Sequence, residues 1–324
     1  MRTRILITIG DINGIGPEII LKSLSREDIA KRYDITVVTP VSVFEYYYRL
    51  LNLMPVKGMF KIVSIGDEKV KIKPGKITKE SGTISGLAIK TAVGLCKRNE
   101  FDAIVTAPIS KKALNIGGYN YSGHTEMLTD LCKSCDSVMV MISKKIIMGF
   151  ASTHPPLKEA PKLINQEMLA GKLEICYKTL KNDFGISKPQ IGVLSLNPHA
   201  GESGQIGREE IDIIKPSMVK IRKLHKGLKL EGPFPSDSYF AFKTYNRFDL
   251  TFAMYHDQGF IPFKMIAGLK GVNFTAGLPI VRTSPDHGTA YDIAGKNLAD
   301  EASLVEAIKS ADKIFKTRKL HPSS

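Results

Sequence analysis

Histidines are the first residues of this 324-residue chain whose positions suggest chemistry. Five of the seven lie in turn segments punctuated by glycine or proline, and three of these, His154, His199 and His256, each follow a short apolar run. Neutral imidazole is the commonest nitrogen ligand of divalent transition metals, and three protein ligands with one open position form a catalytic arrangement. The three histidines have no local ligand spacing, so turn histidines held by nearby backbone are the alternative to a metal site.

Two glycine-containing segments could approach an anion or a flat ligand closely. Residues 10–18, GDINGIGPE, join a predicted strand to a predicted helix but match neither the Walker A nor the Rossmann glycine pattern. Their amides could hold an anion at the helix start, or the segment could be a tight turn with Pro17 as the first helical residue. In the second segment, 287–296, Asp292 could accept hydrogen bonds from ribose hydroxyls, as acidic residues do in NAD sites.

Two cationic residues, Lys264 and Arg282, flank Asn273 in the last third of the chain. A guanidinium group suits carboxylate and phosphate because it donates two parallel hydrogen bonds. From the pattern alone, either residue could instead form a surface salt bridge.

An α/β fold is expected to position these segments. Short apolar runs alternate with longer amphipathic stretches, which predicts a largely parallel sheet with helices between its strands. In such sheets ligands bind beyond the carboxyl ends of strands, where the histidine segments fall, so the pattern indicates an enzyme. We expect strands at residues 4–9, 35–39, 61–65, 101–106, 138–142, 146–153, 190–196 and 250–255, and helices at 17–24, 43–53, 85–98, 125–135, 166–181, 209–225 and 304–315. We expect an excursion or hairpin at 69–82 and a frayed tail at 316–324.

The composition excludes several classes of protein. Hydrophobic residues make up 43% and charged residues 24% of the chain, which is ordinary for a globular protein and argues against disorder. No apolar run approaches the roughly 20 residues that span a bilayer, and the N-terminal run lacks a signal-peptide cleavage site, so we expect a cytoplasmic protein without membrane contact. The net charge of +14 comes from scattered lysines that do not interleave with aromatic residues, so we expect no nucleic-acid partner. Cys132 and Cys135 lack a second cysteine pair, so we expect them to be structural.

Several longer motifs, taken together, resemble the PdxA family of 4-hydroxythreonine-4-phosphate dehydrogenases. They occur in the family's order and cover nearly the whole chain, which makes them more specific than any isolated motif. The matching stretches are GDINGIGPE (10–18), TAPISK (106–111), SGHTE (122–126), THPPL (153–157), NPHAGESGQIGREE (197–210), GPFPSD (232–237), YHDQG (255–259) and VNFTAGLPIVRTSPDHGTAYDIAG (272–295).

The resemblance implies an α/β fold of the isocitrate/isopropylmalate dehydrogenase type, with two sequence-interleaved domains and the active-site cleft between them. An approximate division assigns 1–125 and 265–324 to a cofactor-side domain and 126–264 to a domain for dimerisation and metal binding. The resemblance also implies a homodimer with a shared active site, the cofactor NAD with NADP left open, and a divalent metal, either zinc, magnesium, cobalt or manganese.

The resemblance further implies roles for individual residues. The implied metal ligands are His154, His199 and His256, with His256 of the partner subunit completing each set. The implied substrate contacts are His124, Thr125, Lys264, Asn273 and Arg282. The segment HGTAYDIAG is similar to the adenosine-binding loop of isopropylmalate dehydrogenases, which implies cofactor contacts from His287, Gly288, Thr289, Ala290 and Asp292. Lys264 is the implied catalytic cation, and Asp257 and Asp237 are both candidates for the general base.

The implied reaction is the oxidation of 4-phosphooxy-L-threonine at C3. The product, 2-amino-3-oxo-4-phosphooxybutanoate, is a β-keto acid that loses CO2 to give 3-amino-2-oxopropyl phosphate in pyridoxal 5'-phosphate biosynthesis. A paralogue that oxidises another phosphorylated hydroxy acid, such as 4-phosphoerythronate, would use the same residues. An acyl- or phosphotransferase of related fold and a binder with a basic surface are further alternatives, which the strand-end histidines and the scattered charge disfavour.

Overall fold

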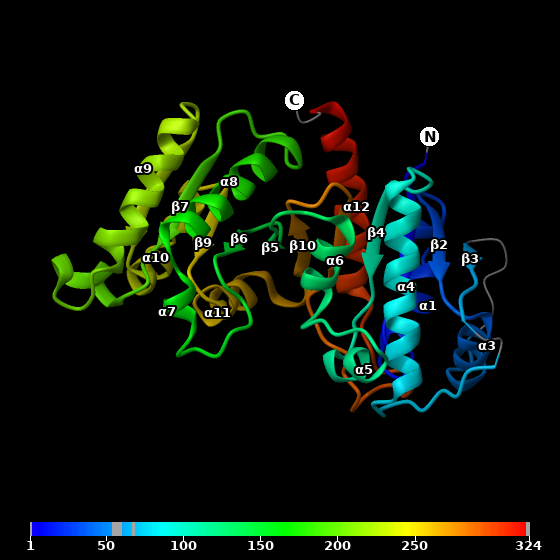
Figure 1. Ribbon diagram of the computed structural model, residues 1–324. Helices are drawn as coiled ribbons and strands as arrows, with labels where there is room; N and C mark the ends of the chain where they lie inside the picture. Colours follow the sequence, from blue (N-terminus) through cyan, green and yellow to red (C-terminus); the bar gives the residue numbers. More distant parts are fainter. Residues whose placement is uncertain (1, 54–59, 67–68, 322–324) are drawn as a thin grey trace. The chain divides into compact units, whose positions relative to one another are not determined.

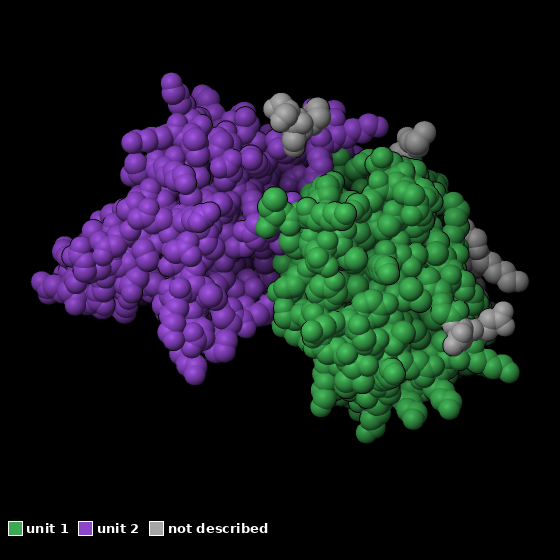
Figure 2. All heavy atoms as spheres, in the orientation of Figure 1, with its two compact units in different colours: residues 1–135, 278–315 green, residues 136–277, 316–324 purple. Residues whose placement is uncertain are grey.

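The computed structural model describes residues 2–53, 60–66 and 69–321 (Figure 1). The chain divides into two compact units (Figure 2): unit 1 comprises residues 1–135 and 278–315, and unit 2 comprises residues 136–277 and 316–324. Both units are therefore interrupted in sequence. The boundaries predicted from the sequence, after residues 125 and 264, lie somewhat earlier in the chain than these.

Five parallel strands form the sheet of unit 1, in the order β3-β2-β1-β4-β11. The central strands are short runs of aliphatic residues whose side chains are buried on both faces, as is typical of parallel strands covered by helices. Ile7, for example, pairs with Val37 on one side and Val105 on the other. The strands are β1 (Arg4–Thr8), β2 (Asp34–Val38), β3 (Lys61–Val63), β4 (Ala103–Thr106) and β11 (Val281–Pro285).

Helix α4 (Lys79–Lys97) packs against β1, β2 and β4. It begins at Lys79 because the Thr78 side chain accepts a hydrogen bond from the amide of Ser81 at 3.1 Å, which caps the first turn. The sequence prediction began this helix at Ser85 and is wrong for residues 79–82, because their polar side chains hide the start of the helix. The other helices of unit 1 are α1 (Gly16–Leu24), α2 (Glu27–Ala30), α3 (Val41–Leu50), α5 (Lys111–Ile116), α6 (His124–Cys132) and α12 (Ala302–Leu320).

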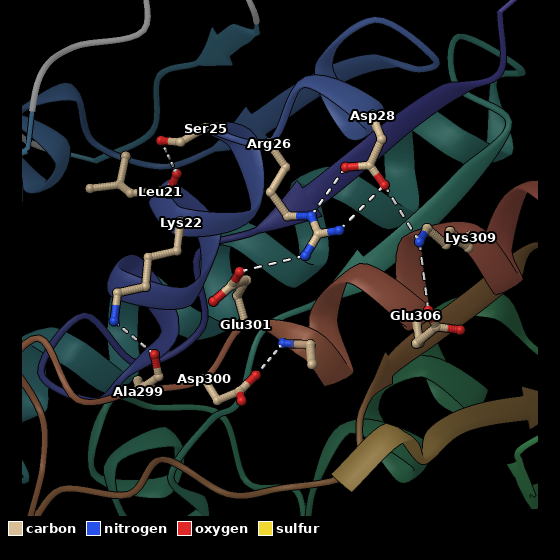
Figure 3. Close-up of polar contacts among 11 residues, drawn as sticks. Leu21, Lys22, Ser25, Arg26, Asp28, Ala299, Asp300, Glu301, Glu306 and Lys309 are labelled. Atoms are coloured by element: carbon tan, nitrogen blue, oxygen red, sulfur yellow. Dashed lines mark hydrogen bonds and ion pairs between the residues drawn. The ribbon is translucent and has the colours of Figure 1, made fainter.

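Polar contacts join the two stretches of chain that build unit 1 (Figure 3). Arg26, between α1 and α2, contacts Asp28 at 3.1 Å and Glu301 at 3.8 Å. Lys309 of α12 lies 3.6 Å from the same Asp28 carboxylate. Exposed ion pairs of this kind contribute at most about 1 kcal/mol each. We therefore expect them to align the C-terminal segment more than to stabilise it.

The sheet of unit 2 has the order β10-β5-β6-β9-β7-β8. Strand β5 is antiparallel to both of its neighbours, β10 and β6, whereas β6, β9, β7 and β8 are parallel. The fold is thus α/β with a largely parallel sheet, as predicted. The strands are β5 (Val138–Ile142), β6 (Ile147–Phe150), β7 (Gln190–Leu194), β8 (Lys229–Phe234), β9 (Leu250–Ala253) and β10 (Val272–Ala276).

Helices α8 and α9 pack against each other, and α11 packs against β6 and β9. The helix predicted at 209–225 begins with a π-helical segment (η2) before continuing as α9. The helical segments are α7 (Ala160–Leu163), α8 (Gln166–Asn182), η1 (Pro198–Gly204), η2 (Glu210–Ile214), α9 (Lys215–Leu224), α10 (Ser236–Ala241), η3 (Thr244–Arg247), α11 (His256–Ala267) and η4 (Gly268–Lys270).

The predicted frayed tail is wrong for residues 316–320, because α12 continues to Leu320. Arg318 Nε donates to Oδ1 of the buried Asp183 at 2.7 Å, which ties this end of the helix to unit 2. Residues 322–324 lie outside the described residues. All four cysteines are free thiols, with Cys132 buried and Cys135 exposed. Within the described part of the chain, we find no helix with the length and apolar character needed to cross a membrane.

Candidate active site

Four neighbouring strand ends of unit 2 carry predicted site residues. Strands β6, β9, β7 and β8 are parallel and lie side by side, so their carboxyl ends meet at one edge of the sheet (Figure 1). His154 follows β6, His256 follows β9, His199 follows β7 and Asp237 follows β8. This edge is where open α/β sheets bind ligands.

His154 and His256 form a pair within one chain. Their ring centroids lie 6.1 Å apart, with the planes inclined by 40°. The hydrogen bonding between β6 and β9 continues beyond the strands, because the amide of Ser152 donates to the carbonyl of Met254 at 3.2 Å. This pairing places the two histidines at the same height along the edge of the sheet. With a Zn–N distance of about 2 Å, two imidazoles so spaced can share one ion. The sharing of His256 across a dimer stays a prediction.

The imidazole of His256 is oriented from two sides. Its Nδ1 lies 2.6 Å from Oδ1 of Asp257, and its ring stacks on Phe260 at 4.1 Å. Metal-ligating histidines commonly give their other ring nitrogen to a carboxylate, which here leaves Nε2 for an ion. Gly259 lets α11 approach the sheet, because a Cβ there would lie 2.4 Å from the ring of Phe150. The geometry thus fits a metal ligand, with Asp257 as its orienting partner.

His199 lies on a left-handed turn. Residues 199–203 all have positive φ, between 43° and 79°, although only Gly201 lacks a Cβ. Left-handed helical conformation costs roughly 1–2 kcal/mol for each residue with a Cβ, so the surrounding structure must hold this turn. Across residues 2–53, 60–66 and 69–321, no group of three or more His, Cys, Asp or Glu residues is arranged to hold an ion within one chain. His199 as the third ligand stays a prediction.

Unit 1 contains a buried cation beside a half-buried histidine whose Nε2 is buried. Arg282 is 1% exposed, and its Nε and Nη2 donate to Thr106 Oγ1 at 3.1 and 2.6 Å. Burial lowers the pKa of Arg282 to about 9, so the side chain stays cationic at neutral pH. Burial, and secondly the Arg282 charge, lower the pKa of His124 well below its usual value, so its imidazole is neutral.

His124 is also the first residue of α6, where backbone amides point outward. Its buried Nε2 has no hydrogen-bond partner among the described residues. A buried polar atom without a partner is costly, and an anion at a helix N-terminus would supply one. Thr125 is half-buried in the same turn. The predicted contacts His124, Thr125 and Arg282 therefore lie in surroundings suited to a phosphate or carboxylate.

The loop at 10–16 has the geometry of a tight turn. Every residue in it is buried, and the amides of residues 11, 13, 14 and 15 already donate to acceptors within the protein. The amides of Asp11 and Ile15 donate to the carbonyls of Pro108 and Thr289, at 2.8 and 3.0 Å. Those of residues 13 and 14 donate to Asp11 at 2.9 and 3.0 Å. Of the two alternatives that the sequence left open, the structure favours the turn.

This turn supports the predicted cofactor loop. Besides the bond from Ile15 to Thr289, the Tyr291 hydroxyl donates to Asp11 Oδ2 at 2.7 Å. The predicted contacts stand on this supported loop: Gly288 and Asp292 are exposed, and His287, Thr289 and Ala290 are half-buried. His287 Nε2 has no hydrogen-bond partner among the described residues. The loop therefore combines a fixed backbone with accessible polar groups.

Asp11 should make stability depend on pH. Burial raises the pKa of Asp11, partly offset by hydrogen bonds from Tyr291, Asn13 and Ser81. Because its pKa is higher in the folded than in the unfolded state, its contribution to stability falls as the pH rises through the folded-state value. We therefore expect the unfolding free energy of the wild type to decrease relative to Asp11→Asn between about pH 4 and pH 8.

Urea denaturation of both proteins across this pH range measures the effect. Asp28→Asn is a control of opposite sign, because a hydrogen bond from Arg26 lowers the pKa of Asp28. With the measurement extended down to about pH 3, wild type should gain stability relative to that variant as the pH rises to about 5 and stay level above it, because the pKa of Asp28 lies below its ordinary value in the folded state. The gain should be small, because Asp28 is half-exposed. The same direction of change for both variants would contradict this prediction.

The remaining predicted residues lie in unit 2. Lys264 is exposed on α11, the helix that begins at His256. Asn273 is half-buried on β10, and its Oδ1 has no hydrogen-bond partner among the described residues. Asp237 is exposed in the first turn of α10. The predicted substrate contacts are thus divided between the units, with His124, Thr125 and Arg282 in unit 1.

Two residues that sequence reasoning missed link the strand ends. Gln258 Nε2 donates to the carbonyl of Ser195 at 2.6 Å and to Ser236 Oγ at 2.8 Å, and its Oε1 accepts from the amide of Met254. It therefore joins the ends of β7, β8 and β9. Glu210, the second, binds the chain just before His199. Both occur in matched motifs, but their long-range contacts have no local pattern.

Comparisons with known proteins identify the family of this chain. The family model of the pyridoxal phosphate biosynthetic protein PdxA matches residues 23–311. The 4-hydroxythreonine-4-phosphate dehydrogenase of Prosthecochloris aestuarii is 39% identical over 98% of this chain and 98% of that protein. The D-threonate 4-phosphate dehydrogenase of Cupriavidus necator is 38% identical over 96% of this chain and 97% of that protein.

A solved structure extends the likeness to the fold. The 4-hydroxythreonine-4-phosphate dehydrogenase of Klebsiella pneumoniae is 34% identical, with a TM-score of 0.85 over 97% of this chain and 98% of that chain. The expected α/β dehydrogenase-like fold is confirmed. The chain therefore belongs to the PdxA family and is a dehydrogenase of the PdxA type.

Proposed function

We propose that this protein uses NAD and a divalent metal to oxidise 4-phosphooxy-L-threonine to 2-amino-3-oxo-4-phosphooxybutanoate, which decarboxylates to 3-amino-2-oxopropyl phosphate. The observation that carries the proposal is the buried Arg282 beside neutral His124, whose Nε2 has no hydrogen-bond partner among the described residues. These groups match an anionic substrate. A homodimer with a shared active site is part of the proposal.

In this proposal, Arg282 and His124 hold the phosphate or the carboxylate of the substrate. Arg282 supplies a planar cation with several donors, and Thr106 fixes its orientation through two hydrogen bonds. His124 supplies a donor from Nε2 in the appropriate neutral tautomer. Their burial excludes water, which strengthens the attraction to an anion. Lys264 is the further cation proposed for the substrate.

The ring nitrogens of His154 and His256, both in unit 2, are proposed to bind the metal, with His199 as the third ligand. When bound, a divalent ion supplies Lewis acidity to the hydroxyl that is oxidised. His256 is kept in one orientation by Asp257 and Phe260, so its Nε2 needs little rearrangement. Zinc, cobalt, magnesium and manganese remain the candidate ions.

The loop at 287–292 is proposed to bind the dinucleotide. When bound there, NAD would supply the hydride acceptor for C3, and the hydroxyl proton would go to a general base. Asp292, exposed on this loop, suits the ribose hydroxyls of NAD and would repel the 2'-phosphate of NADP. For the base, Asp237 has an exposed carboxylate, whereas Asp257 is engaged with His256. Asp237 is therefore the better-placed candidate.

The direct test is NADH formation with 4-phosphooxy-L-threonine, followed by absorbance at saturating Co²⁺. We expect turnover that depends on both substrate and metal, and the proposal requires kcat/KM to be higher for 4-phosphooxy-L-threonine than for D-threonate 4-phosphate. D-threonate 4-phosphate and 4-phosphoerythronate should be assayed with the same preparation. A higher kcat/KM for either of these two compounds would identify that compound as the substrate instead. No turnover of any of the three compounds by a folded protein would refute the proposed dehydrogenase activity.

D-threonate 4-phosphate is the second candidate because one of the relatives described above is named for it. It carries a C2 hydroxyl where 4-phosphooxy-L-threonine carries an amine. The proposed Arg282 and His124 contacts involve the phosphate or carboxylate, which both compounds share. They therefore support either substrate equally, and the comparison of efficiencies decides.

A further inference from the structure

We propose that Glu210 is a positioning residue that holds the left-handed turn of residues 199–203 and thereby fixes His199 at the edge of the sheet. The inference rests on the proposed function in one respect, namely that His199 is a metal ligand. It goes beyond that function because Glu210 would touch neither metal nor substrate and would act only through the backbone that carries His199.

The side chain of Glu210 is bound to the residues just before the turn. It is 1% exposed, and its Oε1 accepts hydrogen bonds from the amides of Leu196 and Asn197, both at 2.8 Å. Its Oε2 accepts from Asn197 Nδ2 at 2.9 Å. One carboxylate therefore receives three N–H donors, which fixes the direction in which the chain leaves β7.

Glu210 also packs against the turn itself. A Cβ built on Gly201 would lie 2.7 Å from Glu210 Oε2 and 2.7 Å from the carbonyl oxygen of Gly207. The turn thus lies directly against the carboxylate, and Gly201 is the residue that permits this approach, with a φ of +79°. Because the turn and the carboxylate are in contact, a shift of Glu210 should reach the turn directly.

The turn needs such support because little else holds it. Inside it, the amides of Gln205 and Ile206 donate to the carbonyls of Glu202 and Gly201, at 3.2 and 3.1 Å. His199 is exposed, so packing of its own side chain does not fix the backbone. Three N–H groups just before the turn, the amides of Leu196 and Asn197 and the Asn197 side chain, donate to Glu210 instead. Glu210 is the first residue of the π-helical segment, and this position directs its carboxylate toward the turn. Such π-helical segments often occur at functional sites.

Glu210→Gln is the test substitution, since it preserves size. The glutamine oxygen can still accept from the two backbone amides, but its Nε2 would face Asn197 Nδ2, so two donors would oppose each other. In metal-free protein we expect amide hydrogen exchange across residues 196–207 to become at least about tenfold faster, with α8 unchanged. We expect Co²⁺ affinity to fall about 10- to 100-fold, as for other outer-shell residues, with an altered visible spectrum of the Co²⁺-loaded protein.

Glu209→Gln is the matched control. Glu209 Oε2 accepts from the same Asn197 Nδ2, at 2.7 Å, but Glu209 binds neither backbone amide. A glutamine at position 209 can therefore turn its oxygen toward Asn197 Nδ2 without losing another of these bonds, whereas a glutamine at position 210 cannot. We expect this variant to stay within about threefold of wild type in both measurements. Gly201→Ala is the second test variant, because its Cβ would press on the Glu210 carboxylate. It should change exchange and Co²⁺ affinity in the same direction, and it replaces Glu210→Gln if that variant does not fold.

The outcomes separate this inference from the proposed function. Wild-type exchange in Glu210→Gln would overturn the inference, whether or not Co²⁺ affinity changes. Faster exchange with unchanged Co²⁺ affinity and spectrum would also overturn it, provided that His199→Ala weakens Co²⁺ binding. If His199→Ala binds Co²⁺ as the wild type does, the proposed metal role of His199 fails, and the link from Glu210 to that ligand fails with it. Exchange then reports separately whether Glu210 holds the turn.

Discussion

Replacing Arg282 by methionine is expected to lower kcat/KM for 4-phosphooxy-L-threonine about 10²- to 10³-fold, the loss typical when one preorganised charged donor is removed. Arg282 is buried, and Thr106 is its hydrogen-bonding neighbour from β4. Methionine fills a similar volume without a charge to bury, and such replacements of buried ionic groups are often neutral for stability. Initial rates of NADH formation measure activity, and a thermal melt of the same protein checks its fold.

The distribution of this loss between KM and kcat carries more information than its size. If Arg282 holds a phosphate that does not react, substrate and transition state lose the same interaction, so KM should rise while kcat changes little. Arg282→Lys keeps the charge but loses the planar fork, so it should recover only part of the activity. A fall in kcat alone would instead place Arg282 at the reacting carbons.

Arg26→Met is the control for loss of an arginine as such. Arg26 is 42% exposed, contacts Asp28 and Glu301 in unit 1, and is not a predicted site residue (Figure 3). Its removal should leave kcat/KM within about twofold of wild type, since exposed ion pairs contribute little. If Arg282→Met also stays within about twofold, Arg282 does not bind the substrate.

Much of the fold follows from local patterns. Strand β5 matches the predicted residues 138–142 because five consecutive apolar residues form a fully internal strand. Helix α8 lies within one residue of its prediction because its apolar periodicity is regular and Asn165 caps its start. Strand ends then indicated where the histidines would gather, since parallel strands place their carboxyl ends at one edge. That much requires only periodicity and the geometry of parallel sheets.

Other elements could not be predicted locally. Strand β8 contains Gly232 and Pro233, which resemble a turn, yet its pairing with β7 holds it extended. Helix α11 contains Pro262 and approaches the sheet only because Gly259 faces Phe150. Neither property is visible without the partner element. The left-handed backbone conformation of the turn at 199–203 also depends on tertiary contacts, because residues other than glycine do not favour positive φ angles by themselves.

The chemistry of the site shows the same limit. For Arg282, a surface salt bridge and a buried anion contact were both compatible with the sequence. Arg282 lies within β11 and is buried, which excludes the surface salt bridge, whereas the anion contact stays a prediction. Only the packed sheet shows this burial. The sequence predicts Asp257 only as a candidate general base. The 2.6 Å contact favours orientation, and that choice can be tested.

His154→Ala and His256→Ala are expected to weaken Co²⁺ binding by more than about 100-fold, because removal of a ligand should exceed the roughly 10- to 100-fold loss typical of outer-shell residues. The two rings lie 6.1 Å apart and belong to neighbouring strand ends, so each loss should remove one donor of the same ion. Titration of metal-free protein with Co²⁺, followed by visible absorbance, measures the affinity. His225→Ala is the control, since that ring stacks on Tyr177 at 4.0 Å and is not a predicted ligand.

Asp257→Asn then separates two roles for one carboxylate. If Asp257 orients His256, the variant should lose about 10- to 100-fold in Co²⁺ affinity and should recover much of its activity at saturating Co²⁺. If Asp257 is instead the general base, Co²⁺ affinity should stay near the wild-type value, while kcat falls about 10²- to 10⁴-fold at any metal concentration. The hydrogen bond between Nδ1 and Oδ1 predicts the first result, because a carboxylate that holds the imidazole cannot simultaneously point toward a substrate hydroxyl with the same oxygen. Wild-type Co²⁺ affinity in both histidine variants would contradict the metal site itself, whatever the behaviour of Asp257→Asn.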